Sequence, residues 1–206
     1  AAARKAAREA GIPIIPGSNG ILSDLKNAEN TAKEIGFPVM IKATAGGGGR
    51  GIRIAKNAKE FLALASQSSA EAKAAFGNGD LYLEKFISNA RHIEVQILGD
   101  GENFIHCFER ECSIQRRRQK VWEEAPCCFL SSEIRDSLCQ SAVALARTVK
   151  YRGAGTVEYL YDEKSKNFYF IEMNTRIQVE HPITECITGV DLLVEMINIA
   201  SGAKLS

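Results

Sequence analysis

The chain has 206 residues, of which 45% are hydrophobic, so it can bury a core as one large domain or two small ones. Its 26 Lys and Arg residues nearly cancel its 25 Asp and Glu residues, which excludes a global electric field that would attract nucleic acid or an anionic membrane. No stretch approaches the roughly 18 consecutive apolar residues that a membrane-spanning helix needs.

The first 86 residues predict a compact α+β unit that follows a short helix over residues 1–10. Apolar residues at helical spacing predict a helix over 23–35. Asn57 and Glu60 form a capping-box pattern, which predicts another helix from Asn57 to about Ala75. Strands are predicted over 38–42, 52–55 and 81–86.

A second unit is predicted from residue 91 onward. Alternating apolar and polar residues predict two hairpins, one over 93–97 and 104–108 and one over 156–161 and 168–173. Ser131 or Ser132 is expected to cap a helix that ends at Gly153 and turns Leu138, Ala142, Leu145 and Val149 inward. His181 precedes Pro182, which predicts an extended backbone, and an amphipathic helix is expected over 191–200.

A run of glycines separates the first two predicted strands. Gly46, Gly48 and Gly51 fit G-x-G-x-x-G, but residues 52–54 alternate like a strand, whereas the dinucleotide-binding pattern needs a helix there. No Lys-Ser or Lys-Thr follows the last glycine, which excludes a P-loop. The run therefore predicts a hairpin tip whose backbone N–H groups contact phosphate, with Lys42 as a nearby charge; a plain flexible turn is the alternative.

Three oxygen-bearing side chains are predicted to meet on the second hairpin. If Tyr161 opposes Tyr169, then Glu158 faces Glu172, and Asn174 shares that face because it lies two residues further along the strand. Directly opposed carboxylates destabilise a sheet unless a cation offsets them, and these hard oxygen donors suit Mg²⁺ or Mn²⁺. The alternative is an exposed strand pair whose glutamates point into water, and a register slip of one residue would send one glutamate to the other face.

Two polar patterns leave alternatives open. Residues 116–120 contain four basic side chains next to Trp122, which permits nucleic-acid binding, although a pocket for phosphate or bicarbonate fits the other motifs better. His92 alternates with Glu94 and Gln96 on a predicted strand, so it either contacts a ligand or faces solvent.

Several strings resemble the biotin carboxylase family of ATP-grasp enzymes. They are residues 46–51, 84–86, 109–117, 153–156 and 170–182. Other ATP-grasp enzymes, such as carbamoyl-phosphate synthetase, share the E-x-N-x-R core at 172–176 but resemble this chain less beyond it. The resemblance implies an α+β ATP-grasp fold, truncated at both ends, with a linker helix over 1–15, a small lid over 16–86 and a larger antiparallel-sheet subdomain with flanking helices over 87–206.

The resemblance also implies roles for individual residues. ATP would be bound by Lys42, Gly46, Gly47, Gly48, Gly49, Gly51, Glu84, Lys85, Ile87, His92 and Gln115. The resemblance implies two metal ions, Mg²⁺ or Mn²⁺, which would be held by Glu158, Glu172 and Asn174. Glu180 would be the general base for bicarbonate, Lys120, Gln178 and the Val179 backbone would position it, and Arg176 would stabilise charge on the biotin oxygen.

The implied activity is ATP-dependent carboxylation of biotin by bicarbonate through carboxyphosphate. The implied partners are biotin on a carrier domain and a carboxyltransferase, without nucleic acid or membrane, in the cytoplasm or an organelle matrix; six cysteines without a C-x-x-C pair agree with a reducing compartment. We expect the segment to begin after the family's N-terminal domain and to stop before its C-terminal one, and therefore to have little activity alone. Arg118 stands where many members have His, so it receives no role.

Two other functions stay open at this point. The chain could be another ATP-grasp ligase that activates a different carboxylate, although the Q-V-E-H-P string at 178–182 disfavours this. It could also be a non-catalytic nucleotide-binding or RNA-binding module that uses residues 116–120.

Overall fold

The computed structural model describes residues 2–18, 20–22, 24–45, 52–117 and 119–205, and it divides into two compact units. One unit is Ile15–Ser88, and the other combines Ala1–Ile14 with Asn89–Ser206. The expected glycine loop at 46–51 and Arg118 lie outside the described residues. Among the helices of the described part, none has the length and apolar character needed to cross a membrane.

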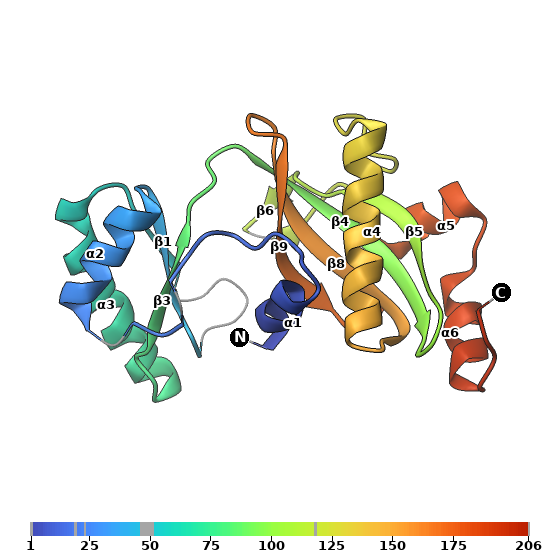
Figure 1. The fold of residues 1–206 in the computed structure, drawn as a ribbon, viewed down its shortest axis with the longest axis horizontal. Coiled ribbons are helices and arrows are strands. Elements are labelled where there is room, and N and C mark those ends of the chain that lie inside the picture. The colour runs from blue at the N-terminus through green and yellow to red at the C-terminus, as the bar shows by residue number, and fades with distance from the viewer. Residues whose placement is uncertain (1, 19, 23, 46–51, 118, 206) are drawn as a thin grey trace. The chain divides into compact units, whose positions relative to one another are not determined.

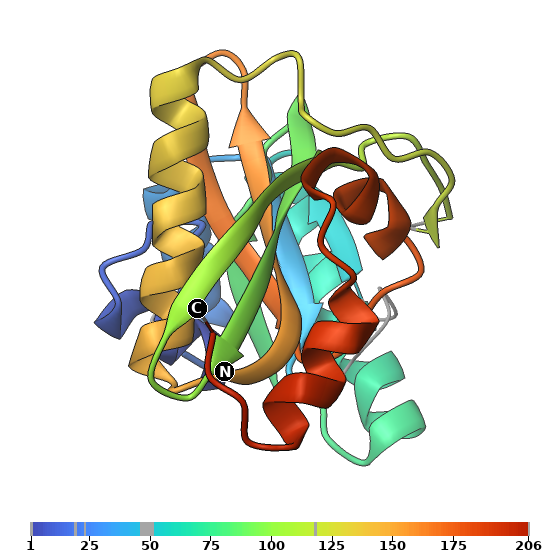
Figure 2. The same ribbon diagram turned by 90° about the vertical axis from the view of Figure 1, so that its right-hand side faces the viewer.

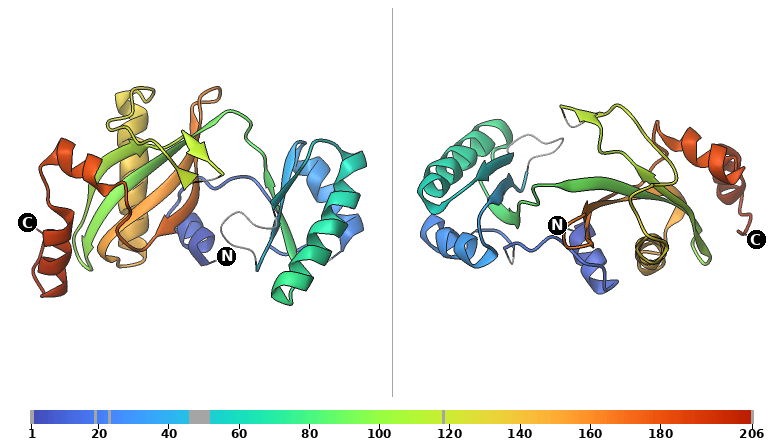
Figure 3. Two further views of the ribbon diagram at one scale, coloured as in Figure 1. Left: turned by 180° about the vertical axis from the view of Figure 1, so that it is seen from behind. Right: turned by 90° about the horizontal axis from the view of Figure 1, so that it is seen from above.

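The unit Ile15–Ser88 is a three-stranded antiparallel sheet with two helices on the same side of it (Figure 3). The strand order is β2-β1-β3, with β1 at Val39–Ala43, β2 at Ile52–Ala55 and β3 at Leu81–Lys85, and the helices are α2 at Leu25–Ile35 and α3 at Ala58–Phe76. Ile41, Phe61 and Leu83 are fully buried in its core. The capping box at the start of α3 is confirmed, because the Glu60 N–H donates to Asn57 Oδ1 at 3.1 Å.

The other unit is a four-stranded antiparallel sheet of order β5-β4-β8-β9 (Figure 1). Its strands are β4 (Ala90–Asp100), β5 (Phe104–Glu111), β8 (Arg152–Asp162) and β9 (Asn167–Asn174). Two very short strands, β6 (Gln115–Arg116) and β7 (Gln119–Lys120), form a separate hairpin. The helices are α1 (Ala2–Glu9), α4 (Ser132–Thr148), α5 (His181–Thr188) and α6 (Leu192–Ala200).

The two faces of the four-stranded sheet differ in chemistry. Because successive side chains of a strand point to opposite faces, Ile93, Val95 and Ile97 pack in one core with α4, and the residues between them face the other way. On that second face, Leu98 packs with α6, whereas Glu94 and Gln96 are fully buried polar residues. Figure 2 shows α4 on one side of the sheet and α5 and α6 on the other. The buried polar residues mark the functional site.

The register of the hairpin β8–β9 differs from the prediction at its turn end. Tyr161 pairs with Phe168 and not with Tyr169, so that prediction was wrong. A β-bulge between Glu158 and Tyr159 then shifts the pairing by one residue, so that Glu158 does oppose Glu172 as predicted. The bulge is the reason that both glutamates reach the same face of the sheet.

Two helix predictions also need correction. Val149 is 43% exposed and serves as the C-cap of α4, which ends before Gly153, so Val149 is not part of the inner face. His181 begins α5 rather than an extended segment. The reason is that Pro182 occupies the first turn of the helix, where a backbone N–H would have no helical partner in any case.

Candidate functional site

The polar face of the four-stranded sheet contains a pocket of about 610 Å³. Its walls come from β4, the hairpin β6–β7, β8, β9 and the segment that leads into α5. Ten of the residues expected to have functional roles line it: His92, Gln115, Lys120, Glu158, Glu172, Asn174, Arg176, Gln178, Val179 and Glu180. The structure therefore brings together residues that are up to 88 positions apart in the sequence, from His92 to Glu180.

Lys120 lies at the centre of the charged side chains of the pocket. Its Nζ is 2.8 Å from Glu158 Oε1 and 2.5 Å from Glu180 Oε1, and it also forms an ion pair with Glu94. Burial alone would lower the pKa of Lys120, but the charge of Glu94 and the contacts with Glu158 and Glu180 outweigh it and raise that pKa. Lys120 is therefore a permanent cation near neutral pH.

The carboxylate of Glu158 contacts four other side chains of the pocket. Its Oε1 accepts hydrogen bonds from Lys120 Nζ, Asn174 Nδ2 at 2.8 Å and Gln178 Nε2 at 3.2 Å. Its Oε2 lies 3.1 Å from His92 Nε2. Burial would raise the pKa of Glu158, but His92 and Lys120 lower it to about 2, so this carboxylate is ionised at neutral pH.

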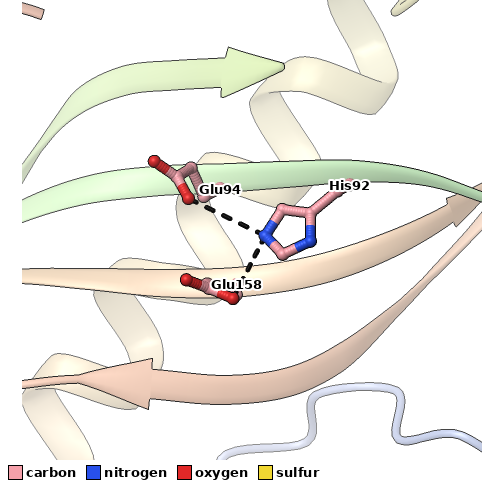
Figure 4. Close-up of side chains that lie close together, drawn as sticks. All are labelled: His92, Glu94 and Glu158. Carbon is pink, nitrogen blue, oxygen red and sulfur yellow. Dashed lines mark ion pairs between the residues drawn. The ribbon is translucent and has the colours of Figure 1, made fainter. Parts of the chain in front are cut away.

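His92 points between two carboxylates from neighbouring strands (Figure 4). Its Nε2 is 3.8 Å from Glu94 Oε2 and 3.1 Å from Glu158 Oε2, and one ligand atom from each of the three residues lies within 4.8 Å of the others. Among the described His, Cys, Asp and Glu residues, this group has the spacing to hold a metal ion.

The metal set expected from the sequence overlaps this group only at Glu158. Glu172 opposes Glu158 across the ladder β8–β9, and the Asn174 amide bonds directly to Glu158. Two carboxylates and an amide are hard oxygen donors on one pocket wall, so they fit Mg²⁺ or Mn²⁺. Glu172 is exposed and Asn174 is half-buried, which leaves both reachable from solvent.

The segment before α5 supplies the remaining pocket residues. Glu180 occupies the N-cap position of α5, and although its burial would raise its pKa, the hydrogen bond from Lys120 lowers it. Gln178 is buried, and its Oε1 has no hydrogen-bond partner, so it offers an acceptor inside the pocket. Val179 is 92% exposed, and Arg176 is exposed with its Nη1 3.1 Å from the Ile177 carbonyl.

Sequence reasoning missed the buried polar layer beneath the pocket. Glu94 and Arg110 are both fully buried, and Arg110 Nε donates to Glu94 Oε1 at 2.7 Å. The alternation of His92, Glu94 and Gln96 was the available signal; of its two interpretations, the solvent-facing one does not hold, because Glu94 and Gln96 are fully buried. Of the basic run, Lys120 turns into the pocket, whereas Arg116 and Arg117 are exposed.

The expected nucleotide contacts outside the pocket lie in the unit Ile15–Ser88. Lys42 on β1 forms an ion pair with the buried carboxylate of Glu84 on the neighbouring strand β3. Lys85 Nζ donates to the carbonyls of Gly36 at 2.6 Å and Phe37 at 3.2 Å, so its side chain is held within this unit. Ile87 is half-buried after the end of β3.

A family model described as "Carbamoyl-phosphate synthase L chain, ATP binding domain" matches residues 1–206 of the chain. The chain belongs to this family. Within the carbamoyl-phosphate synthase L chain ATP-binding family, it is similar to proteins named biotin carboxylase. It is 56% identical over 206 residues to the chloroplastic biotin carboxylase of Arabidopsis thaliana, a match that covers 100% of this chain and 38% of the relative.

The chain is also similar to solved structures of biotin carboxylases. A biotin carboxylase from Campylobacter jejuni in a β,γ-ATP complex has a TM-score of 0.91 and 48% identity, over 99% of this chain and 46% of that one. A second structure is the biotin carboxylase domain of 2-oxoglutarate carboxylase from Hydrogenobacter thermophilus, in complex with MgADP, ADP and bicarbonate. It has a TM-score of 0.88 and 53% identity, and the match covers 98% of this chain and 44% of that one. The α+β ATP-grasp fold is thus confirmed. The chain spans less than half the length of these relatives.

Proposed function

We propose that the chain is the ATP-binding and catalytic core of a biotin carboxylase, which uses ATP to carboxylate biotin with bicarbonate. The relatives support this, because one is named biotin carboxylase and another was solved with MgADP and bicarbonate. The observation that carries the proposal is the position of Lys120. Its ammonium contacts both Glu158, a member of the proposed metal set, and Glu180, the proposed general base, and all three residues line the pocket.

The nucleotide is proposed to bind with its metal at the pocket wall formed by β8 and β9. Glu158, Glu172 and Asn174 would hold Mg²⁺ or Mn²⁺, which would neutralise the phosphate oxygens during transfer. The residues proposed to contact ATP are Lys42, the glycines of 46–51, Glu84, Lys85, Ile87, His92 and Gln115. In this proposal, residues 16–86 act as the lid, residues 87–206 as the larger subdomain, and residues 1–15 as the linker.

The chemical steps follow from the ionised groups of the pocket. Glu180 takes the proton of bicarbonate, while Lys120, the free acceptor Gln178 Oε1 and the Val179 backbone hold the anion. A bicarbonate oxygen then forms a bond to the γ-phosphorus, and the bond to the ADP oxygen breaks, which gives carboxyphosphate and ADP. Carboxyphosphate breaks at its C–O bond into CO₂ and phosphate. The released phosphate takes the proton of the biotin ureido nitrogen, Arg176 stabilises the negative charge that develops on the ureido oxygen, and the nitrogen then forms its bond to CO₂.

The contact between Lys120 and Glu180 has two effects on this step. Because it lowers the pKa of Glu180, it keeps the carboxylate ionised and able to accept a proton. The same contact makes Glu180 a weaker base, so proton transfer gains when bicarbonate draws Lys120 away from it. Lys120 therefore serves both as an anion-binding group and as a control on the basicity of Glu180.

The proposal includes the partners that the reaction needs. Biotin would arrive on a carrier domain, and a carboxyltransferase would pass the carboxyl group to an acceptor. The relatives include proteins named as chloroplastic and mitochondrial, which supports an organelle matrix as the compartment; the cytoplasm is the other proposed compartment.

The test is ATP cleavage by the full-length protein with and without bicarbonate and free biotin. We expect cleavage to depend on bicarbonate, and ¹⁸O from labelled bicarbonate to appear in inorganic phosphate, because the C–O bond of carboxyphosphate breaks. Glu180→Gln should lower the rate by about 100-fold or more, the usual contribution of general acid–base catalysis. A rate of ATP cleavage that does not change with bicarbonate would refute the proposal. Salt-dependent RNA binding that ATP does not affect would favour the RNA-binding alternative.

A further inference from the structure

Arg110 is buried below the pocket and contacts four side chains. From β5, it donates from Nε to Glu94 Oε1 at 2.7 Å and from Nη1 to Gln96 Oε1 at 2.9 Å, both on β4. Nη2 donates to Thr156 Oγ1 on β8 at 3.2 Å. Nη1 also donates to Thr184 Oγ1 on α5 at 2.7 Å. Its planar group of donors thus joins three strands of the sheet to one helix.

Thr184 is the point at which this network reaches α5. Its side chain is fully buried, and it is the buried residue of this eight-residue helix, all of which is described. A helix of two turns is not stable by itself and depends on tertiary contacts. Glu180 sits at the N-cap of α5 and makes no side-chain capping bond, so the cap does not fix the start of the helix.

Gln178 and Glu180, before the helix, contact Glu158 and Lys120, but the other side-chain hydrogen bonds of α5 itself do not replace this anchor. His181 Nδ1 lies 2.8 Å from the Gln178 carbonyl, and the Leu192 N–H donates to Glu185 Oε1 at 2.8 Å, so both contacts stay within residues 178–192. Neither connects α5 to the sheet. The Arg110–Thr184 bond does so, and the same arginine also holds Glu94, which pairs with Lys120.

We propose that Arg110 is a positioning residue that fixes α5 through Thr184, and so keeps Glu180 in place beside Lys120 for the reaction with bicarbonate. The inference rests on the proposed function for its kinetic consequence, but the mechanical part concerns only residues of this chain. Arg110 is fully buried and is not among the residues that line the pocket. It sets the distance between two groups that come from different elements, the hairpin β6–β7 and the segment before α5.

The test compares two threonines that accept from the same arginine. Thr184→Val removes the bond to α5, whereas Thr156→Val removes the bond to β8, whose backbone is held by ladder bonds on both sides. Thr184→Ser keeps a hydroxyl and should restore the wild-type behaviour. We expect amide hydrogen exchange within α5 to become about tenfold faster or more in Thr184→Val, and to stay unchanged in Thr156→Val and Thr184→Ser.

The kinetic prediction is a selective one. In the full-length protein, Thr184→Val should raise KM for bicarbonate about tenfold, while KM for ATP stays within about twofold and Thr184→Ser behaves like the wild type. If Thr184→Val does not fold, Thr184→Ala, which also lacks the hydroxyl, takes its place in both measurements.

Three results decide between the possibilities. Equal α5 exchange in Thr184→Val and Thr184→Ser would overturn the inference, and so would parallel changes in KM for ATP and bicarbonate. A wild-type protein without bicarbonate-dependent ATP cleavage would overturn the proposed function instead, and the exchange comparison would still decide whether Arg110 holds α5 through Thr184.

Discussion

Replacing Glu94 with Gln removes one buried negative charge and leaves the shape of the side chain almost unchanged. Glu94 is fully buried and contacts two cations, Arg110 and Lys120. In Glu94→Gln, these cations stay buried with less negative charge around them. No cavity forms, so any loss of stability comes from electrostatics and hydrogen bonding rather than from packing.

The size of the effect follows from what each cation keeps. Breaking a buried ion pair by removing one partner costs about 3–5 kcal/mol. Lys120 retains Glu158 and Glu180, and Arg110 retains three neutral acceptors, so we expect the lower end, about 3 kcal/mol. For a domain of this size, that corresponds to a decrease in Tm of about 6–12 °C.

The assay is thermal unfolding followed by tryptophan fluorescence. The chain has one tryptophan, Trp122, which lies in the same unit as Glu94, so its signal follows the unfolding of that unit. The matched control is Glu102→Gln, because Glu102 forms an ion pair with Lys204 at 2.7 Å but its side chain is 73% exposed. Such an exposed pair contributes at most about 1 kcal/mol. Equal shifts in Tm for the two variants would refute the claim that Glu94 is a buried structural charge.

Two further predictions concern titration and thiol reactivity. The pKa of Glu158 is lowered from 4.5 to about 2, so its stabilising contribution is complete above pH 4.5 and is lost as the pH falls toward 2. The free energy of unfolding, measured with urea between those pH values, should therefore depend less on pH in Glu158→Gln than in the wild type. An equal pH dependence in the two proteins would contradict this. All six cysteines are free. A maleimide should modify the exposed Cys128 and Cys186 quickly and the four buried thiols only on unfolding, as measured by mass spectrometry. Burial raises the pKa of Cys112, so rapid labelling of Cys112 would contradict the structure.

Local sequence patterns predicted the elements whose determinants lie close together in the chain. The capping box at Asn57 and Glu60 fixes the start of α3 through residues three apart. Alternation predicted the strands that became β4, β5, β8 and β9. The opposition of Glu158 and Glu172 was predicted correctly, but from a register that holds at only one end of the hairpin. The bulge that corrects the register has no signature in the local sequence.

The buried polar layer could not be predicted, because it depends on contacts between distant segments. Glu94 and Gln96 follow the same alternation whether their face is wet or covered, and α5, 74 residues after Arg110 at Thr184, helps to cover it. The start of α5 was also not predicted. A residue before proline usually has an extended backbone, but Pro182 lies in the first turn of α5, where proline is tolerated, so His181 begins the helix. The candidate ligands were found from their chemistry and from the resemblance, whereas the groups that hold them required coordinates.

The most direct test of the central claim is the binding of Mn²⁺-ADP to the full-length protein, followed by the electron paramagnetic resonance signal of free Mn²⁺. Glu172→Gln removes one of the two opposed carboxylates, and we expect its affinity for Mn²⁺-ADP to fall about tenfold or more. Glu163→Gln, in the turn of the same hairpin and paired with Arg91, should bind like the wild type. Unchanged affinity in Glu172→Gln, or an equal loss in both variants, would contradict a metal–nucleotide site built on Glu158 and Glu172.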